Sequence, residues 1–260
     1  MSARRSELWR FYILLFSLSV PFWLLGSVVG QLPIPINLPL GALMAALPAT
    51  IALWLTLKDG GRTRVVELLR RVLDLARVRH QGWIVFAAVL MPVALLLAYG
   101  LQRWAGEALP AFELPLSTLG AFLLLFLLGG IGEELGWQGF VYPALRAQWS
   151  ALTAGLMLGC LWAVWHIVPF LQAGRSGEWI LWQCMTMLPL RIITVWLFVN
   201  AGESVAVAII FHAMCNVAQF SFPAYGSHYE PLTSFLMLTI IAILIVASHG
   251  ASLARRQPRG

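Results

Sequence analysis

The longest charge-free stretch of this chain limits the kind of fold it can adopt. Residues 11–57 contain no Asp, Glu, Lys or Arg. A membrane-spanning helix needs roughly 20 predominantly apolar residues, so this stretch alone is long enough for two. Of all residues 60% are hydrophobic and only 11% are charged, and the mean hydropathy is +0.82. These values are typical of an integral membrane protein and leave no room for an added soluble domain.

Apolar runs separated by Gly- and Pro-rich turns predict eight membrane-spanning helices. We place them at about 11–30, 39–57, 83–101, 115–145, 150–172, 179–200, 204–222 and 232–249. The fourth run is longer than one crossing requires. We interpret residues 1–260 as a single all-α polytopic membrane domain. No internal repeat is evident, so a transporter built from inverted repeats receives no support.

Basic residues gather in alternate connections and predict the orientation of the helices. With eight spans and both termini cytoplasmic, the arginine-rich segments all face the cytoplasm, as the positive-inside rule requires. These segments comprise Arg4, Arg5, Arg10, residues 58–82, Arg146, Arg255, Arg256 and Arg259. The net charge of +6 then reflects topology and contact with anionic lipid, and nucleic-acid binding is a poor explanation for it. We expect a multi-pass protein of the bacterial cytoplasmic membrane.

Residues 58–82 also show a helical pattern. Val65, Leu68, Leu69, Val72 and Leu75 recur at helical spacing, whereas Glu67, Arg70, Arg71, Asp74 and Arg77 occupy the other side. This pattern predicts an amphipathic helix that lies in the cytoplasmic interface and anchors the protein there.

Two adjacent carboxylates interrupt an otherwise uncharged run. Residues 114–132 carry no charge, and Glu133 and Glu134 follow them directly. An ionisable side chain at membrane depth is costly, so this pair is a functional-site hypothesis by default. His166 and His212, in later apolar runs, are the natural partners. At about 1.5 Å per residue, Glu133, His166 and His212 lie roughly 21, 24 and 14 Å from their cytoplasmic turns, which makes one shared polar site feasible.

Helical spacing adds further polar groups to this predicted site. Gln138 lies one turn after Glu134, and Asn216 lies one turn after His212. A carboxylate can take a proton from water, and imidazoles can bind a metal, orient that water or donate to an oxyanion. Asn216 is a further neutral donor to such an oxyanion. These residue types suit hydrolysis of an amide bond without a nucleophilic serine or cysteine.

Three short motifs in this region resemble those of a known family. The run EELGWQGFVYPAL is similar to the first motif of the CPBP intramembrane proteases, which include type II CAAX prenyl proteases and the Abi and lysostaphin-resistance-like proteins. Trp162 and His166 in LWAVWHIVPF, and His212 and Asn216 in IIFHAMCNVA, match the second and third motifs. The resemblance covers roughly residues 115–220, which would form the catalytic core.

This resemblance implies an intramembrane endopeptidase acting on a peptide or a membrane-anchored protein. Glu133 would be the water-activating base, and Glu134 would have a supporting or ligand role. The residues that complete the implied site are His166, His212 and Asn216. The family pattern has Arg where this chain has Gln138, so we expect Arg191, deep in the sixth run, to supply the missing charge to Glu134.

At this point the sequence leaves alternatives open for both the cofactor and the function. Glu133, His166 and His212 match a catalytic set for zinc or another divalent metal with an open position, whereas a metal-free glutamate–histidine mechanism explains the same residues. A non-catalytic membrane immunity or scaffold protein is the second functional interpretation. A proton-coupled transporter is the third, since it would also place Glu and His in the membrane.

Overall fold

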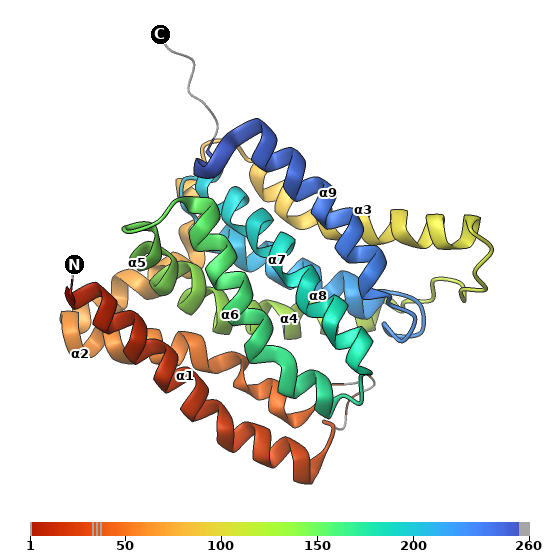
Figure 1. Cartoon of the computed structure of the whole chain (residues 1–260), viewed down its shortest axis with the longest axis horizontal. Helices are drawn as coiled ribbons and strands as arrows, with labels where there is room; N and C mark the ends of the chain where they lie inside the picture. The colour runs from red at the N-terminus through yellow and green to blue at the C-terminus, as the bar shows by residue number, and fades with distance from the viewer. Residues whose placement is uncertain (1, 33, 35, 37, 255–260) are drawn as a thin grey trace.

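A computed structural model describes residues 2–32, 34, 36 and 38–254, which form a bundle of helices (Figure 1). The α-helices are α1 (Ser2–Val29), α2 (Leu47–Arg70), α3 (Gly82–Trp104), α4 (Leu116–Gly136), α5 (Tyr142–Arg146), α6 (Ala151–Gln172), α7 (Gly177–Asn200), α8 (Val205–Ser221) and α9 (Pro231–His249). Shorter 3-10 or π segments are η1 (Leu40–Ala46), η2 (Arg71–Arg77), η3 (Trp137–Val141) and η4 (Gly250–Ser252). Extended pairing in the described ranges is limited to an isolated bridge between Gln31 and Pro39.

The eight predicted apolar runs all become helices. Within the described ranges, seven helices are long and apolar enough to cross a membrane, and α8, with 17 residues, is a shorter apolar helix. The all-α polytopic fold is therefore confirmed. Local hydropathy predicted these elements because each run must satisfy its backbone hydrogen bonds internally, which a helix does within one segment.

The overlong fourth run has a structural explanation. Helix α4 ends at Gly136, the π-helical turn η3 follows at Trp137–Val141, and α5 continues to Arg146. A π turn widens the helix and shifts the direction of the side chains that follow it. Glu133 and Glu134 lie just before this turn, whereas Gln138 lies within it.

One end of the bundle, which we call the arginine-rich end, gathers the start of α1, the α2–η2 segment, α5 and the end of α9. Three contacts lie at this end: Arg10 of α1 to Asp59 of α2 at 2.9 Å, Ser204 Oγ before α8 to Asp74 of η2 at 2.7 Å, and Asn200 Nδ2 at the end of α7 to the Leu253 carbonyl after α9 at 2.7 Å. The opposite end carries the connections after α1, α3, α6 and α8. The side chains of Arg4 and Arg5, and all of Arg255, Arg256 and Arg259, lie outside the described part of the chain.

The predicted amphipathic helix is present, but as a continuation of α2. Gly61 has φ 74° and ψ −178°, so the helix kinks there before it continues into η2. One residue of the predicted polar face is buried instead. Leu69 and Leu75 are exposed, whereas the Asp74 carboxylate is 9% exposed and accepts hydrogen bonds from Ser204 and from the first backbone N–H groups of α8. Asp74 is drawn inward because the free N–H groups at a helix start attract a negative charge.

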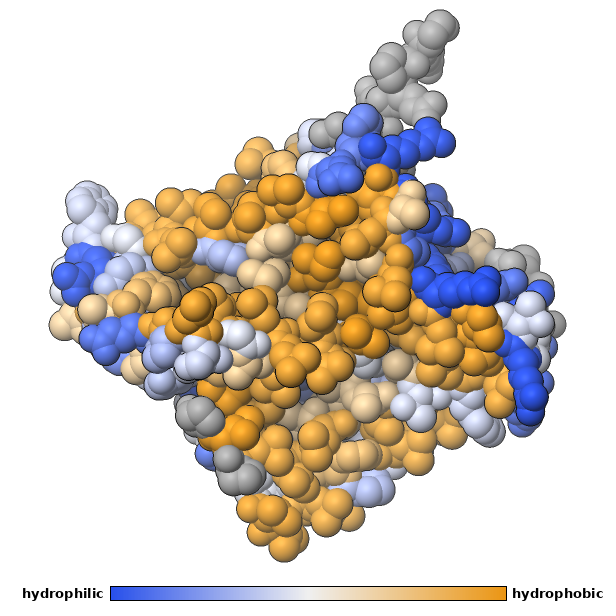
Figure 2. All heavy atoms as spheres, turned by 180° about the vertical axis from the view of Figure 1, so that it is seen from behind, coloured by the Kyte–Doolittle hydropathy of each residue, from blue (hydrophilic) through white to orange (hydrophobic). Residues whose placement is uncertain are grey.

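The surface of the bundle is consistent with a lipid environment. Figure 2 shows a broad hydrophobic band between polar side chains at the two ends of the molecule. Large apolar side chains exposed among the described residues include Leu96 and Leu97 of α3 and Ile240, Ile243 and Leu244 of α9. Contiguous exposed apolar surface of this extent is rare on soluble monomers and is expected where a protein meets lipid.

Candidate active site

Glycines on α4 and α6 allow the helices around the acidic pair to approach closely. A Cβ on Gly132 would lie 2.6 Å from the Ala45 carbonyl oxygen, and one on Gly136 would lie 2.5 Å from Pro48. On α6, a Cβ on Gly159 would come within 3.3 Å of Arg191. The glycines therefore bring η1, α2 and α7 against the segments that carry the polar side chains.

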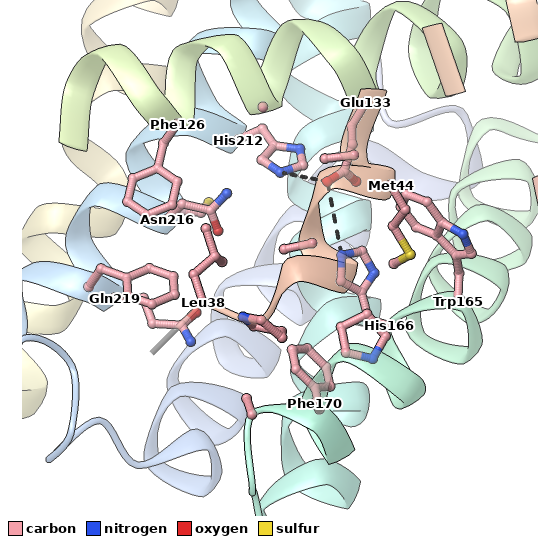
Figure 3. Close-up of a pocket in the computed structure, with 18 of the residues that line it drawn as sticks. Leu38, Met44, Phe126, Glu133, Trp165, His166, Phe170, His212, Asn216 and Gln219 are labelled. Atoms are coloured by element: carbon pink, nitrogen blue, oxygen red, sulfur yellow. Dashed lines mark ion pairs between the residues drawn. The ribbon is translucent and has the colours of Figure 1, made fainter. Parts of the chain in front are cut away.

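One oxygen of the Glu133 carboxylate accepts hydrogen bonds from two indoles, and the other oxygen faces two imidazoles. Its Oε2 accepts hydrogen bonds from the indole Nε1 of Trp162 at 2.6 Å and of Trp137 at 3.4 Å. Its Oε1 lies 3.9 Å from His166 Nε2 and 3.8 Å from His212 Nε2 (Figure 3). Both gaps are longer than a direct hydrogen bond, so a water molecule can lie among the three groups.

Glu134 points to the other side of α4 and makes different contacts. Arg191 Nη1 donates to both of its oxygens, at 3.0 and 2.8 Å, and His212 Nδ1 donates to Oε1 at 2.8 Å. Glu134 and Arg191 are each only 1% exposed. The expected pairing of Arg191 with Glu134 is therefore present. It joins α4, α7 and α8 in one buried polar network.

Hydrogen bonds place a proton on Nδ1 of both imidazoles. His166 Nδ1 lies 2.9 Å from the Trp162 carbonyl oxygen, which can only accept, so this nitrogen carries the proton. His212 Nδ1 likewise donates to the Glu134 carboxylate. The Nε2 atoms of both rings are consequently left to face Glu133 Oε1, as in other sites where one ring nitrogen is oriented through the other.

Trp162 connects the two halves of the site. Its ring lies 5.4 Å from the rings of both His166 and His212, and the Arg191 guanidinium lies 4.6 Å from its centroid. The Arg191 cation thus neutralises Glu134 directly and lies over the indole whose N–H holds Glu133. Sequence spacing identified Trp162, but it missed Trp137, which lies four residues after Glu133 and so shares its helical face.

Asn216 and Gln138 have different surroundings. Asn216 lies one turn beyond His212 beside the same cavity, and its amide makes no hydrogen bond within the described part of the chain. Gln138 is fully buried, and neither its Oε1 nor its Nε2 has a hydrogen-bond partner among the described residues. It makes no hydrogen bond to Glu134, because Arg191 and His212 bind that carboxylate and Gln138 lies within the π turn.

The polar residues of the candidate site lie at the wall of a cavity of about 370 Å³. Glu133, His166, His212 and Asn216 all line it, so the convergence expected from their depths is observed. The rest of its wall is largely apolar and comes from Leu32, residues 38–46, the middle of α4, the end of α6, the first half of α7 and the end of α8.

The direction of this cavity corrects one expectation. The arginine distribution predicts a site that opens toward the cytoplasm, past the cytoplasmic ends of the fourth and seventh predicted spans, with substrates entering laterally or from that side. The cavity instead extends toward the opposite end, because its walls come from the last turns of α6 and α8 and the first turns of α7. Exposed leucines at the seam of η1 and α4, Leu43 and Leu128, also line it, which gives a lateral approach from the lipid.

The metal assignment stays a prediction. Within the described ranges, no group of three or more His, Cys, Asp or Glu side chains is arranged to hold a metal ion. Glu133 Oε1 is 3.8–3.9 Å from the two Nε2 atoms, and its Oε2 is already bonded by indoles. A carboxylate and two imidazoles can also activate a water molecule by proton transfer and hydrogen bonding alone.

Comparisons with known proteins agree with this geometry. The family model for type II CAAX prenyl endopeptidases (Rce1-like) matches residues 115–218, which include every residue of the Glu and His site. The CAAX prenyl protease 2 of Methanococcus maripaludis is 28% identical over 149 residues, covering 50% of this chain and 53% of that protein. Both similarities support the CPBP family for the part of the chain that they cover.

The seven candidate spans among the described residues, together with the family match, indicate a multi-pass membrane protein. The chain spans about half the length of the curated relative it matches. Residues outside the matched region also support the site, since Asp74 caps α8, and Leu32 and residues 38–46 form part of the cavity wall. The sequence contained no local signal for either contribution.

Proposed function

We propose that this protein is an intramembrane endopeptidase that hydrolyses a peptide bond of a membrane-associated substrate with a water molecule activated by Glu133. The observation that carries the proposal is the placement of Glu133 Oε1 opposite two imidazole Nε2 atoms inside a cavity. The family match supports the same reaction class.

In this mechanism a water molecule lies between Glu133 Oε1 and His166 Nε2. It gives one proton to Glu133 while its oxygen bonds to the carbonyl carbon of the substrate, and His166 accepts its other hydrogen bond. Indole donors on Oε2 keep the carboxylate oriented, so little reorganisation is needed when the proton moves.

The oxyanion that forms needs donors on the other side of the carbonyl. His212, protonated on both nitrogens, donates through Nε2, and Asn216 donates through its amide. Glu134 and Arg191 act through His212, because the Glu134 carboxylate fixes its ring and supports its positive charge. The proton on Glu133 then passes to the amide nitrogen, the C–N bond breaks, and a carboxylic acid and an amine leave.

Hydrolysis in H₂¹⁸O tests this function. The purified protein in proteoliposomes, given a library of membrane-anchored peptides, should release fragments whose new C-terminal carboxylate contains ¹⁸O. Glu133→Gln keeps the shape but cannot accept the proton, so cleavage should fall by about 10²- to 10⁴-fold. Glu107→Gln, an exposed substitution outside the site, is the matched control. Undiminished cleavage by Glu133→Gln refutes the assigned role, and no labelled product from any peptide favours the immunity or scaffold alternative.

The orientation and the lipid contacts form part of the same proposal. The arginine-rich end would face the cytoplasm and anionic headgroups, with both termini on that side. Single-cysteine variants in residues 62–70 should then react with impermeant reagents only from the cytoplasmic side. Labelling from the other side alone reverses the orientation.

A further inference from the structure

One face of α7 lines the cavity with a regular series of side chains. Trp179, Gln183, Met187 and Leu190 recur at three- and four-residue spacing, and all of them line the cavity. Arg175, four residues before Trp179 in the turn between α6 and α7, lines it too. The outer part of this face is polar, whereas its inner part is apolar and ends beside Arg191.

Arg175 is a half-buried cation without a carboxylate partner in the described part of the chain. Its guanidinium lies 4.6 Å from the Trp179 ring centroid, and the described residues place no carboxylate within 4.0 Å of it. Burial lowers the pKa of this guanidinium, and no neighbouring acid offsets the effect. A partly desolvated guanidinium with free donors binds carboxylates well, because its planar fork matches the two oxygens.

Two further groups on this face are buried without hydrogen-bond partners. Gln183 is 6% exposed and its Oε1 has no donor, and the Nε1 of Trp179 has no acceptor, among the described residues. Buried polar atoms are normally paired, so each such exception needs an explanation. One acceptor and one donor, four residues apart beside a cavity, complement the N–H and C=O groups of an extended peptide.

A series of packed rings gives an upper limit for the distance between Arg175 and the Glu133 site. His166 packs on Phe170 at 5.7 Å, Phe170 on Trp179 at 5.3 Å, and the Arg175 guanidinium lies 4.6 Å from Trp179. The His166 ring and the guanidinium are therefore at most about 16 Å apart. An extended chain covers roughly 3.3 Å per residue, so at most about five residues fit between them.

We propose that Arg175, Trp179 and Gln183 form a substrate-recognition subsite for a peptide carboxylate within about five residues of the cleaved bond. This inference rests on the proposed function. Arg175 binds the carboxylate, which is either the C-terminus of the substrate or an Asp or Glu side chain. Gln183 Oε1 accepts a backbone N–H, Trp179 Nε1 donates to a backbone carbonyl, and the apolar inner part of the α7 face contacts the residues next to the cleaved bond.

Matched peptides test the subsite. Membrane-anchored peptides should be compared with a C-terminal acid or amide, and with Asp or Asn at each of the five positions after the cleaved bond. The wild type should prefer the form with a carboxylate by about 10- to 100-fold in kcat/KM, as expected for a charge-assisted contact. The acid/amide pair and the Asp/Asn pairs separate the two sources of the carboxylate.

Three variants assign the preference to residues. Arg175→Gln should abolish the preference for a carboxylate, and Arg175→Lys should retain part of it. Gln183→Leu should weaken the binding of acid and amide peptides equally, since it removes a contact to the peptide backbone. Arg103→Gln, at the same end of the bundle but bonded to the Leu109 carbonyl, should leave the preference unchanged.

Binding separates failure of the subsite from failure of the protease function. Labelled acid and amide peptides should be titrated by anisotropy against the Glu133→Gln protein in nanodiscs. An Arg175-dependent preference in binding supports the subsite even when no peptide is cleaved. Equal binding and cleavage of acid and amide peptides overturns it while the protease function stands. Activity that depends on anionic lipid but not on the peptide carboxylate overturns it as well.

Discussion

Replacing Arg191 by glutamine removes the cation that neutralises Glu134. Arg191 Nη1 lies 2.8 and 3.0 Å from the two Glu134 oxygens, and both side chains are 1% exposed. Removing one partner of a buried ion pair costs about 3–5 kcal/mol, because the other charge stays buried without compensation. His212 still donates to Glu134 at 2.8 Å, so we expect the lower part of this range, about 3 kcal/mol.

The free energy of unfolding should be measured by SDS titration in mixed micelles, and cleavage should be measured on the same preparations. The double variant Arg191→Gln, Glu134→Gln removes both charges and leaves two amides. It should be more stable than Arg191→Gln alone, with a coupling energy of about 2 kcal/mol. Arg10→Gln, which breaks an exposed pair with Asp59, is the control and should cost less than about 1 kcal/mol.

A second substitution separates charge from shape. Gln138→Arg in the Arg191→Gln background returns a cation to the position where the CPBP pattern has Arg. Recovery of cleavage would attribute the loss to the missing charge. The reasoning is refuted if Arg191→Gln costs less than about 1 kcal/mol and the double variant is no more stable than the single one.

Two other substitutions test features that the structure added. Gln138→Met replaces a buried amide with two unpaired polar atoms by an apolar side chain of similar size, so we expect the free energy of unfolding to rise by about 1–2 kcal/mol; a loss of stability would mean that the amide has a partner. Asp74→Ala removes the acceptor for the first N–H groups of α8 and should cost about 1–2 kcal/mol, with reduced cleavage because His212 lies on that helix. The exposed substitution Asp59→Ala is its control, and equal effects of the two would argue against the cap.

The elements of the fold were predictable because they follow from local chemistry. The predicted starts and ends of α6 and α9 agree with the structure to within about one residue, since each apolar run is bounded by turn residues. The site residues were also predictable in part. Carboxylates and imidazoles are so costly at membrane depth that their presence in apolar runs marked them, and helix geometry gave comparable depths.

The hydrogen-bond partners of the site residues and the direction of the cavity depended on the tertiary arrangement. No pattern along the chain indicated that the indoles of Trp137 and Trp162 hold Glu133 or that Asp74 turns inward to cap α8. The end toward which the cavity extends was predicted wrongly, because it depends on which helix ends separate and not on where arginines gather, whereas a lateral approach was among the predicted routes.

The sequence by itself determined which segments enter the membrane and which ionisable groups go with them. The length and hydrophobicity that a segment needs for this are properties of that segment alone. The tertiary structure alone decided which of those groups meet. Arg191 reaches Glu134 because α7 packs against α6 at Gly159, and Glu133 faces two imidazoles because α8 packs against α4 and the side chain of His166 extends to it from α6. Helix neighbours are chosen by packing of whole surfaces, which no single stretch of sequence encodes.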